Sequence, residues 1–359
     1  MFDTAQHKGL SDIRRILSTT RAGALTCALA LPLLLLIKYG YGLHPRYFHF
    51  ADAAAQWPNV AGPSLLAVGD RALLANSAPA WIAGTLHLTS EHAYIALSLV
   101  ITFLAISGAF LLRMNSRNAS FTRLYFIVAA GGALGPVLLM WVGGYDALLV
   151  CGLVIGVLAR RQWISLSGWV LAAFTHSSVA VPAAITFGVF LIWNSGTWRN
   201  SPQRKQAINA CLGVALGYLA IHWLTDLWGG STDRFALFKL IPFDAILSSY
   251  AHSLPVLVFS GLGIVWFLPL FSSIRKLKCS RHFYVLASLT IGLIPLIAVD
   301  QTRVIALCLA PVTLAWIDAL AIELSLQEVK AVWARMLVPA IVAPIRVVWM
   351  GATYWPYWL

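Results

Sequence analysis

The stretch GGYDALLVCG, residues 143–152, places an aspartate, Asp146, between two long apolar runs, Leu124–Val142 and Ala147–Ala159. Apolar runs recur along the whole chain, and many of them are long enough to cross a bilayer as helices. A charged residue at membrane depth is costly and often marks function. The stretch therefore raises two questions, namely how many spans the chain forms and on which side of the membrane Asp146 lies.

Composition identifies the broad class of protein. Hydrophobic residues make up 60% of the chain and charged residues only 11%, whereas a soluble domain usually carries about 25% charged residues. The apolar runs are continuous rather than alternating, which favours helices over a β-barrel. We therefore predict an all-α, polytopic helical membrane protein in which residues 1–359 form a single transmembrane domain.

The apolar runs predict about eleven transmembrane helices, the first of them an uncleaved span that follows a basic amino-terminal segment. A weaker apolar segment, residues 64–88, contains Asp70 and Arg71 and is predicted to be interfacial or re-entrant. The predicted spans are 23–42, 92–112, 124–142, 147–159, 163–174, 178–193, 207–224, 254–272, 283–298, 304–322 and 336–354.

Basic residues predict the orientation. Lysine and arginine concentrate in cytoplasmic loops, and every connection predicted to be inner is basic when the amino terminus is cytoplasmic and the carboxyl terminus is periplasmic. The net charge of +12 is then an orientation signal, and no nucleic-acid partner is expected. All acidic residues between positions 13 and 317 fall on the outer side, so we expect binding or chemistry to open outward. These acidic residues are Asp52, Asp70, Glu91, Asp146, Asp226, Asp233, Asp244 and Asp300.

The five cysteines predict neither a disulfide nor a metal cluster. Four lie in apolar runs and one lies in a basic loop, and none has the spacing of metal ligands. No cofactor and no metal ligand is predicted, although the outer carboxylates would permit a divalent cation.

Three outer connections are very short. They are GGYDA at 143–147, FTHSS at 174–178 and AVDQTR at 298–303. Their tips place Asp146, His176, Asp300 and Arg303 near the rim of a cavity between helices. Structural roles are the alternatives. Asp146 stands where a residue caps the next helix, Asp300 and Arg303 are spaced to pair with each other, and His176 has the alternative of a hydrogen-bonded packing role.

Two longer outer segments, residues 43–91 and 225–253, mix charged and aromatic residues and are predicted to form a lid or interfacial helices. In the first, Arg46, His49 and Asp52 alternate with aromatic rings, and the second contains Arg234. Aromatic residues at this depth are often interfacial anchors. The same mixture also suits a carbohydrate site, where rings stack on sugars and a carboxylate takes a proton from an attacking hydroxyl.

This layout resembles the multi-spanning glycosyltransferases of the GT-C type and the related membrane polysaccharide polymerases. The stretches GGYDALLVCGLVIGVLARRQW and DQTRVIALCLAP carry the resemblance, together with the short helix pair around His176. The resemblance implies a catalytic aspartate shortly after the first span, and Asp52 is the matching position. Asp146 and His176 are the further catalytic candidates. The candidates for binding the substrate are Arg46, His49, Arg234, Asp300 and Arg303.

The resemblance also implies a function. It predicts transfer or polymerisation of sugars from a polyprenyl-phosphate-linked donor to a glycan or lipid acceptor, at the outer face of the bacterial inner membrane and among its lipids. A transporter or flippase for a lipid-linked glycan or another small substrate is the alternative, although such proteins usually show repeated halves and charges at mid-membrane. A structural membrane subunit is the third possibility.

Overall fold

The computed structural model of the protein describes residues 3–45, 47–58, 76–114, 119–195, 201–227, 243–294, 300–349 and 352–354. Nearly all of these residues are helical. The helices are α1 (Asp3–Tyr39), α2 (Tyr47–Ala55), α4 (Ala78–Thr85), α5 (Glu91–Arg113), α6 (Ala119–Gly131), α7 (Leu134–Met140), α8 (Asp146–Leu158), α9 (Gln162–Asn194), α10 (Pro202–Leu227), α12 (Phe243–Leu262), the 3-10 helix η2 (Gly263–Leu270), α13 (Ser272–Arg275), α14 (Lys278–Leu293), α15 (Gln301–Glu323) and α16 (Leu326–Val342). The strands β1 (Val347–Trp349) and β2 (Ala352–Tyr354) form an antiparallel pair.

The prediction of a helical membrane protein is confirmed by length and composition, whereas the prediction of about eleven spans is not supported. Within the described residues six helical segments are long and apolar enough to cross a membrane, and the pair α6 and α7, bent by 55°, makes a seventh if it is one broken span. The helices α8, α14 and α16 have 13, 16 and 17 residues. They are shorter than the roughly 20 residues that a perpendicular crossing needs.

Helix α9 folds back on itself at His176, whose φ of −156° and ψ of 76° are not helical. The ring centroids of Trp169 and Phe187 lie 5.4 Å apart, although these residues would be separated by about 27 Å along a straight helix. Gln162 and Asn194, the two ends of α9, both line cavities that Gln206 also lines. The predicted pair of short helices with a tight turn at 174–178 is therefore confirmed.

Close packing fixes α8 against the first half of α9. Gly152 and Gly156, four residues apart, face Gly168, and a Cβ atom at Gly168 would lie 2.4 Å from the backbone nitrogen of Gly156. Small residues at this spacing let two helix backbones approach closely within a membrane. This contact sets the position of α8, and the amino-terminal residue of α8 is Asp146.

The carboxyl-terminal region differs from the prediction of a span at 336–354. Helix α16 ends at Val342, and Ala343 is extended, with ψ of 122°. Proline at position 344 explains this end, because the residue before a proline disfavours the helical conformation. The chain continues into β1, and the amide of Val348 donates a hydrogen bond of 2.9 Å to the side chain of Thr302.

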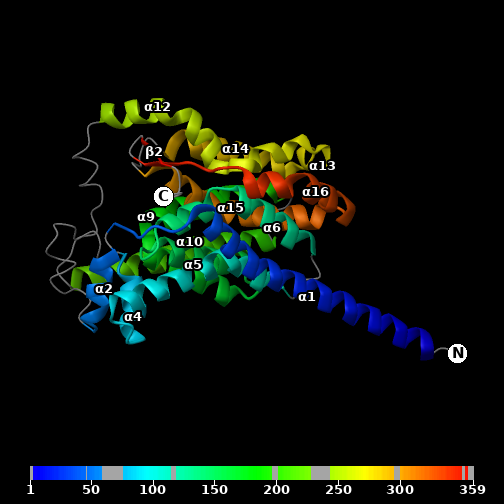
Figure 1. The fold of residues 1–359 in the computed structure, drawn as a ribbon, viewed down its shortest axis with the longest axis horizontal. Helices are drawn as coiled ribbons and strands as arrows, with labels where there is room; N and C mark the ends of the chain where they lie inside the picture. Colours follow the sequence, from blue (N-terminus) through cyan, green and yellow to red (C-terminus); the bar gives the residue numbers. More distant parts are fainter. Residues whose placement is uncertain are drawn as a thin grey trace.

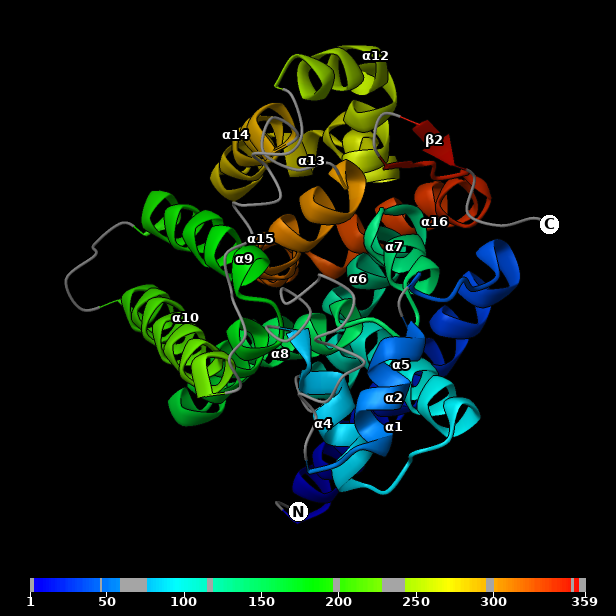
Figure 2. The same ribbon diagram turned by 90° about the vertical axis from the view of Figure 1, so that its left-hand side faces the viewer.

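The two ends of the bundle differ in character. The end that carries α2, α4 and β2 lies opposite the start of α1 (Figure 1). We call it the site end, because the first residues of α8 and α15 also lie there. At the other end, Arg113 pairs with Asp318 at 2.6 Å, and Arg113, Arg160 and Lys205 line one cavity. We call this the basic end. Seen from the site end, α15 lies in the middle of the surrounding helices (Figure 2).

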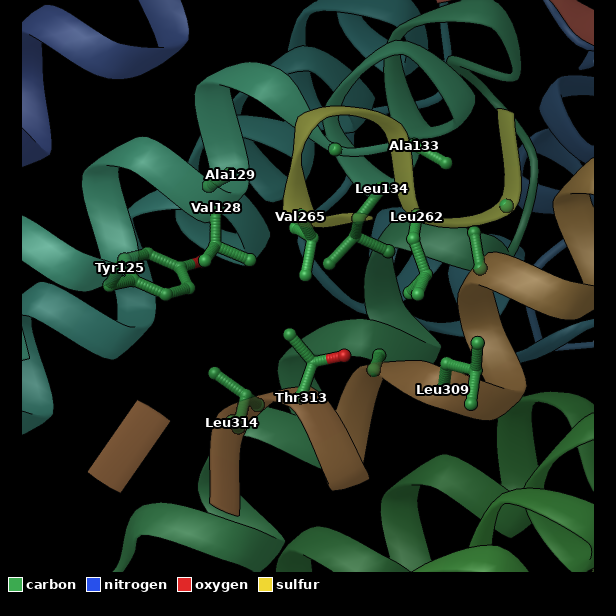
Figure 3. A pocket seen from close by; sticks show the side chains of 14 residues that line it. Tyr125, Val128, Ala129, Ala133, Leu134, Leu262, Val265, Leu309, Thr313 and Leu314 are labelled. Carbon is green, nitrogen blue, oxygen red and sulfur yellow. The ribbon is translucent and has the colours of Figure 1, made fainter. Parts of the chain in front are cut away.

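A small apolar cavity of about 50 Å³ lies where α6 gives way to α7 and where α12 gives way to η2. Figure 3 shows side chains from these helices and from α15 converging on it. Thr313 contributes a hydroxyl group, and the remaining side chains of the lining are hydrocarbon apart from the phenol of Tyr125. With no carboxylate, amine or imidazole in its lining, this cavity offers none of the usual groups for acid–base chemistry.

Candidate functional site

Arg303, on the first turn of α15, joins two carboxylates at the site end. Its Nε and Nη2 atoms donate hydrogen bonds of 2.5 and 2.7 Å to the two carboxylate oxygens of Asp146, and its Nη1 atom donates one of 2.7 Å to Oδ2 of Asp300. Asp146 is 1% exposed and Arg303 is 9% exposed. Ion pairs of this planar, two-pronged kind hold both partners in a fixed orientation. The cluster contains one cation and two carboxylates, so one negative charge is left over when both carboxylates are ionised.

Asp300 differs from Asp146 in that one of its carboxylate oxygens has no hydrogen-bond partner among the described residues. Its Oδ2 atom accepts from Arg303, whereas its Oδ1 atom is buried and has no hydrogen-bond partner within the described part of the chain. Burial raises the pKa of the Asp300 carboxyl above its ordinary value, and the nearby Arg303 charge opposes that effect. A buried polar atom without a partner is unusual in a folded protein. A carboxylate with one oriented oxygen, one free oxygen and a raised pKa is suited to accept a proton.

Aromatic side chains form the wall beside the cluster. The Cζ atom of Arg303 lies 5.5 Å from the ring centroid of Trp141 and 5.1 Å from that of Tyr145. The His44 ring, which is buried, meets Trp141 and Tyr145 at 5.9 and 5.6 Å and Phe50 at 5.9 Å. Cation–π contacts of this kind strengthen when they are shielded from water. The rings of Trp141 and Tyr145 therefore help to fix the position of the guanidinium group.

The backbone at 42–44 and 139–144 determines where this wall stands. The segments pair as a short parallel bridge, in which the amide of His44 donates to Val142 and the amide of Val142 donates to Gly42. Gly143 follows with a φ of +86°, a conformation that other residues rarely adopt. Its carbonyl accepts a hydrogen bond of 2.9 Å from the buried Tyr94 hydroxyl. The tight GGYDA connection thereby directs Asp146 towards Arg303.

His176 reaches the same region from the tip of α9. Its ring stands perpendicular to the ring of Tyr145, with centroids 4.6 Å apart, and its Nδ1 atom lies 3.1 Å from the hydroxyl of Ser178. His176 is 3% exposed. It therefore contacts the aromatic wall.

The first turn of α15 is polar on more than one side. Gln301 accepts a hydrogen bond of 3.2 Å from Ser253, and the Thr302 hydroxyl lies 3.4 Å from that of Ser260. Both Gln301 and Thr302 are buried. These contacts tie the turn that carries Arg303 to α12, and the bond from Val348 ties it to β1.

The structure separates the predicted site residues into two groups. It brings Asp146, Asp300 and Arg303 together, with His176 one aromatic ring away. Asp52, by contrast, lies on the exposed side of α2, while Phe50 on the opposite side packs against Tyr145 and His44.

Of the three remaining predicted residues, the structure describes His49. His49 is half-buried in α2, and its ring lies tilted by 43° against the ring of Phe48, with centroids 4.0 Å apart. Arg46 and Arg234 lie outside the described residues.

The structural alternatives for these residues can also be compared with the geometry. Asp146 is the first residue of α8, but the capping residue is Tyr145 and no side-chain cap is formed. Both oxygens of Asp146 go to Arg303 instead, so the cap alternative is wrong. The Asp300–Arg303 pair does form, and it is part of the larger cluster.

The structure adds four residues that were not predicted from the sequence, namely His44, Trp141, Tyr145 and Thr302. Tyr145 and Thr302 flank predicted site residues, and this proximity is the signal that could have identified them. Within the described residues no group of three or more histidine, cysteine, aspartate or glutamate side chains is placed to hold a metal ion.

Comparisons of the chain with protein-family models, with curated proteins and with solved structures gave no match. A functional interpretation therefore rests on the cluster of Asp146, Asp300 and Arg303 and on the aromatic wall beside it.

Proposed function

We propose that the protein is a membrane glycosyltransferase or polysaccharide polymerase that uses a polyprenyl-phosphate-linked sugar donor. The observation that carries the proposal is the buried cluster of Arg303 with Asp146 and Asp300, walled by aromatic rings at one end of a helical bundle. Glycosyl transfer from such a donor needs a base, a rigid polar frame and flat apolar surfaces for the sugar. The cluster supplies all three types of group within one region.

In this proposal Asp300 is the general base. Its free Oδ1 atom accepts the proton of an acceptor hydroxyl while the hydroxyl oxygen forms a bond to the anomeric carbon of the donor. The bond from that carbon to the phosphate oxygen breaks, and the polyprenyl phosphate or diphosphate leaves with the electron pair. Arg303 keeps the carboxylate oriented through Oδ2, and its positive charge favours the departing anion.

Asp146 serves as the fixed partner of Arg303 rather than as a base, because both of its oxygens accept from the guanidinium group. That contact also occupies the two-pronged face of Arg303, which is the face best suited to bind a phosphate group. The described contacts engage three of the five guanidinium N–H groups. The proposal therefore assigns Arg303 a role of orientation and charge, with direct phosphate contact limited to its remaining N–H groups.

Asp300 replaces Asp52 as the preferred base on geometric grounds. A base must lie close to the frame that orients the reacting groups, and Asp52 lies on the exposed side of α2, opposite the side on which Phe50 packs against Tyr145. The aromatic rings of Trp141 and Tyr145 supply the stacking surfaces, a role that the sequence predicts for the segment 43–91.

The proposed location is the bacterial inner membrane, with the basic end in the cytoplasm and the site end in the periplasm. The distribution of lysine and arginine supports this orientation. In this proposed orientation the site would lie on the face where lipid-linked sugars are used in the proteins that the sequence resembles.

A transporter or flippase for a lipid-linked glycan is the second candidate. The observation that favours it is the number of interrupted helices, namely the bent pair α6 and α7, the change from α12 to η2, and the fold-back of α9. Transporters often build their substrate sites from such discontinuous helices. The buried cluster would then bind the substrate without breaking a bond.

One assay separates the two candidates. The full chain is purified in detergent and incubated with a synthetic polyprenyl-diphosphate-linked disaccharide, and the products are separated by chromatography. An enzyme releases polyprenyl diphosphate or forms longer glycans without any membrane barrier, whereas a transporter leaves the lipid–sugar bond intact and acts only in sealed vesicles. An intact donor in detergent, combined with movement across vesicles, would replace the proposed enzyme by the transporter.

A further inference from the structure

The basic end contains a feature that the proposed reaction does not use. Two cavities of about 340 and 170 Å³ lie there, and they share Val157 and Gln206 in their walls. They lie between the ends of α8, α9 and α15 and the starts of α10 and α14. Together they are far larger than the apolar cavity of Figure 3 and large enough for part of a lipid.

The larger cavity has two kinds of wall. Phe190, Leu191 and Ala315 give it a hydrocarbon surface, and Ile322 at its rim is 75% exposed. Polar side chains stand nearer the end of the bundle, where α9 ends and α14 begins, and they include Asn194, Gln203, Gln206 and Lys278. A cavity with an apolar part and a polar part matches a molecule with a chain and a polar head.

The charges around the two cavities favour an anion. Arg160, Lys205 and Lys278 are exposed cations in their walls. The carboxylate of Asp318 is neutralised by Arg113 at 2.6 Å, so Glu323 is the carboxylate that opposes them in the lining. Basic pockets between transmembrane helices commonly bind the head groups of anionic lipids.

Side-chain hydrogen bonds hold together the helices beside the cavities. The Asn194 side chain donates to the carbonyl of Phe190 and faces the His282 ring nitrogen at 3.2 Å. Asn209 donates to the carbonyl of Gln162 at 3.3 Å. The contact of Asn194 with His282 connects α9 to α14, and the contact of Asn209 with Gln162 connects α10 to α9. These contacts hold the helices beside the cavities in place.

We propose that these two adjacent cavities together bind an anionic lipid, with the phosphate near Lys205 and Lys278 and a hydrocarbon chain along Phe190, Ala315 and Ile322. The phosphate and chain belong equally to an anionic phospholipid or to a polyprenyl phosphate. The site is at the opposite end from Arg303, and it stands whether or not the proposed transfer reaction is correct.

Native mass spectrometry of the full chain in detergent tests the proposal. The probes are phosphatidylglycerol, phosphatidylethanolamine and a polyprenyl phosphate, each added alone and then in competition. We expect retention of at least one anionic lipid and not of phosphatidylethanolamine, and the competition identifies which anionic lipid is preferred. Equal retention of all three lipids, or retention of none, would overturn the proposal.

Two matched variants locate the bound lipid. Lys205→Ala with Lys278→Ala removes two cations from the cavity, and Lys276→Ala with Lys330→Ala removes two exposed cations from the same end but outside the lining. We expect at least a tenfold loss of retention in the first variant and less than a twofold change in the second. An equal loss in both variants would show general attraction of charge and would overturn the site. Ala319→Phe, which fills the apolar wall, should also reduce retention, with detergent melting as the check that the variant is folded.

Discussion

Arg303 and Asp146 lie 157 residues apart in the sequence and meet through two parallel hydrogen bonds at the start of two helices. Both side chains are almost fully buried. Removing one partner of a buried ion pair leaves the other charge without compensation, which usually costs about 3–5 kcal/mol. The contact therefore joins α8 to α15 energetically as well as geometrically.

A double-mutant cycle measures this coupling. We expect Asp146→Asn and Arg303→Gln each to destabilise the protein strongly, and the double variant to lose about 2–3 kcal/mol less than the sum. Unfolding in mixed micelles provides the measurement. The pair Arg113 and Asp318, whose side chains are 13% and 32% exposed, is the control and should show a smaller coupling. Simple additivity at Asp146 and Arg303 would contradict the described contact.

Arg303→Lys separates charge from geometry. Lysine keeps the positive charge, but its ammonium group lacks the planar fork that reaches Asp146 and Asp300 together. We expect turnover to fall at least about tenfold, equivalent to roughly 1.4 kcal/mol in the activation free energy. The detergent assay with the lipid-linked disaccharide measures it. Full activity in this variant would show that orientation of Asp300 by Arg303 is unnecessary.

Asp300→Asn tests the assigned base, and Asp52→Asn is its matched control. Both variants exchange a carboxylate for an amide, but Asp52 is exposed whereas Asp300 lies in the cluster. Since a general base contributes about 10²–10⁴-fold, we expect Asp300→Asn to lose at least about a hundredfold in turnover. The Arg303–Asp146 contact remains, so folding should persist. A larger loss in Asp52→Asn would restore the assignment that the sequence suggested.

The same assignment predicts a pH dependence. A base acts in its deprotonated form, so turnover should fall as the pH falls through the pKa of Asp300. Burial raises that pKa above its ordinary value, so the acid limb should lie above the value of about 3.9 for a free aspartate. The rate profile of the wild type measures it. A rate that stays constant down to pH 4 would contradict the assignment.

Gly143 is expected to be sensitive to substitution for a backbone reason. Its φ is +86°, and an added Cβ atom would lie 2.8 Å from the Cβ atom of Tyr47. A left-handed conformation costs other residues about 1–2 kcal/mol, and the contact adds to that. Gly143→Ala should therefore lower the melting temperature and the turnover. Gly188→Ala is the control, because no atom lies within 4 Å of its added Cβ; equal effects in both variants would contradict the explanation.

The sequence predicted part of the site because tight connections have few conformations. Asp146, His176, Asp300 and Arg303 each stood in a short outer connection, and three of them do meet. The contact between Arg303 and Asp146 was not predictable, because nothing local relates residues in two distant connections. Asp52 was assigned from its place after the first span, although the apolar pattern around Phe50 directs the opposite side of α2 inward.

The fold was predicted at the level of class and less well at the level of spans. The prediction treated every long apolar run as a full membrane crossing, including the runs that form α8, α14 and α16. A short apolar helix can instead be buried among its neighbours without crossing the membrane by itself. The last segment shows the missed signals. Pro344 ends α16 through its effect on Ala343, and the β-branched residues at Val347 and Val348 favour the strand that follows.

The fold-back of α9 and the orientation of the bundle give the last prediction. Because the chain reverses at His176, Gln162 and Ser195 should lie on the same side of the membrane, although they bracket a helical stretch that passes for one span. Single cysteines at Gln162, Ser195 and Lys276, in a chain without its native cysteines, should react with a membrane-impermeant reagent only after the cells are opened. A cysteine at Asp244, at the start of α12, should react in intact spheroplasts. A straight α9 would instead place Gln162 and Ser195 on opposite sides, so reaction of one without the other would contradict the fold-back. If all four positions gave the reverse pattern, the fold-back would stand, but the site end would face the cytoplasm and the proposed outer-face reaction would be wrong.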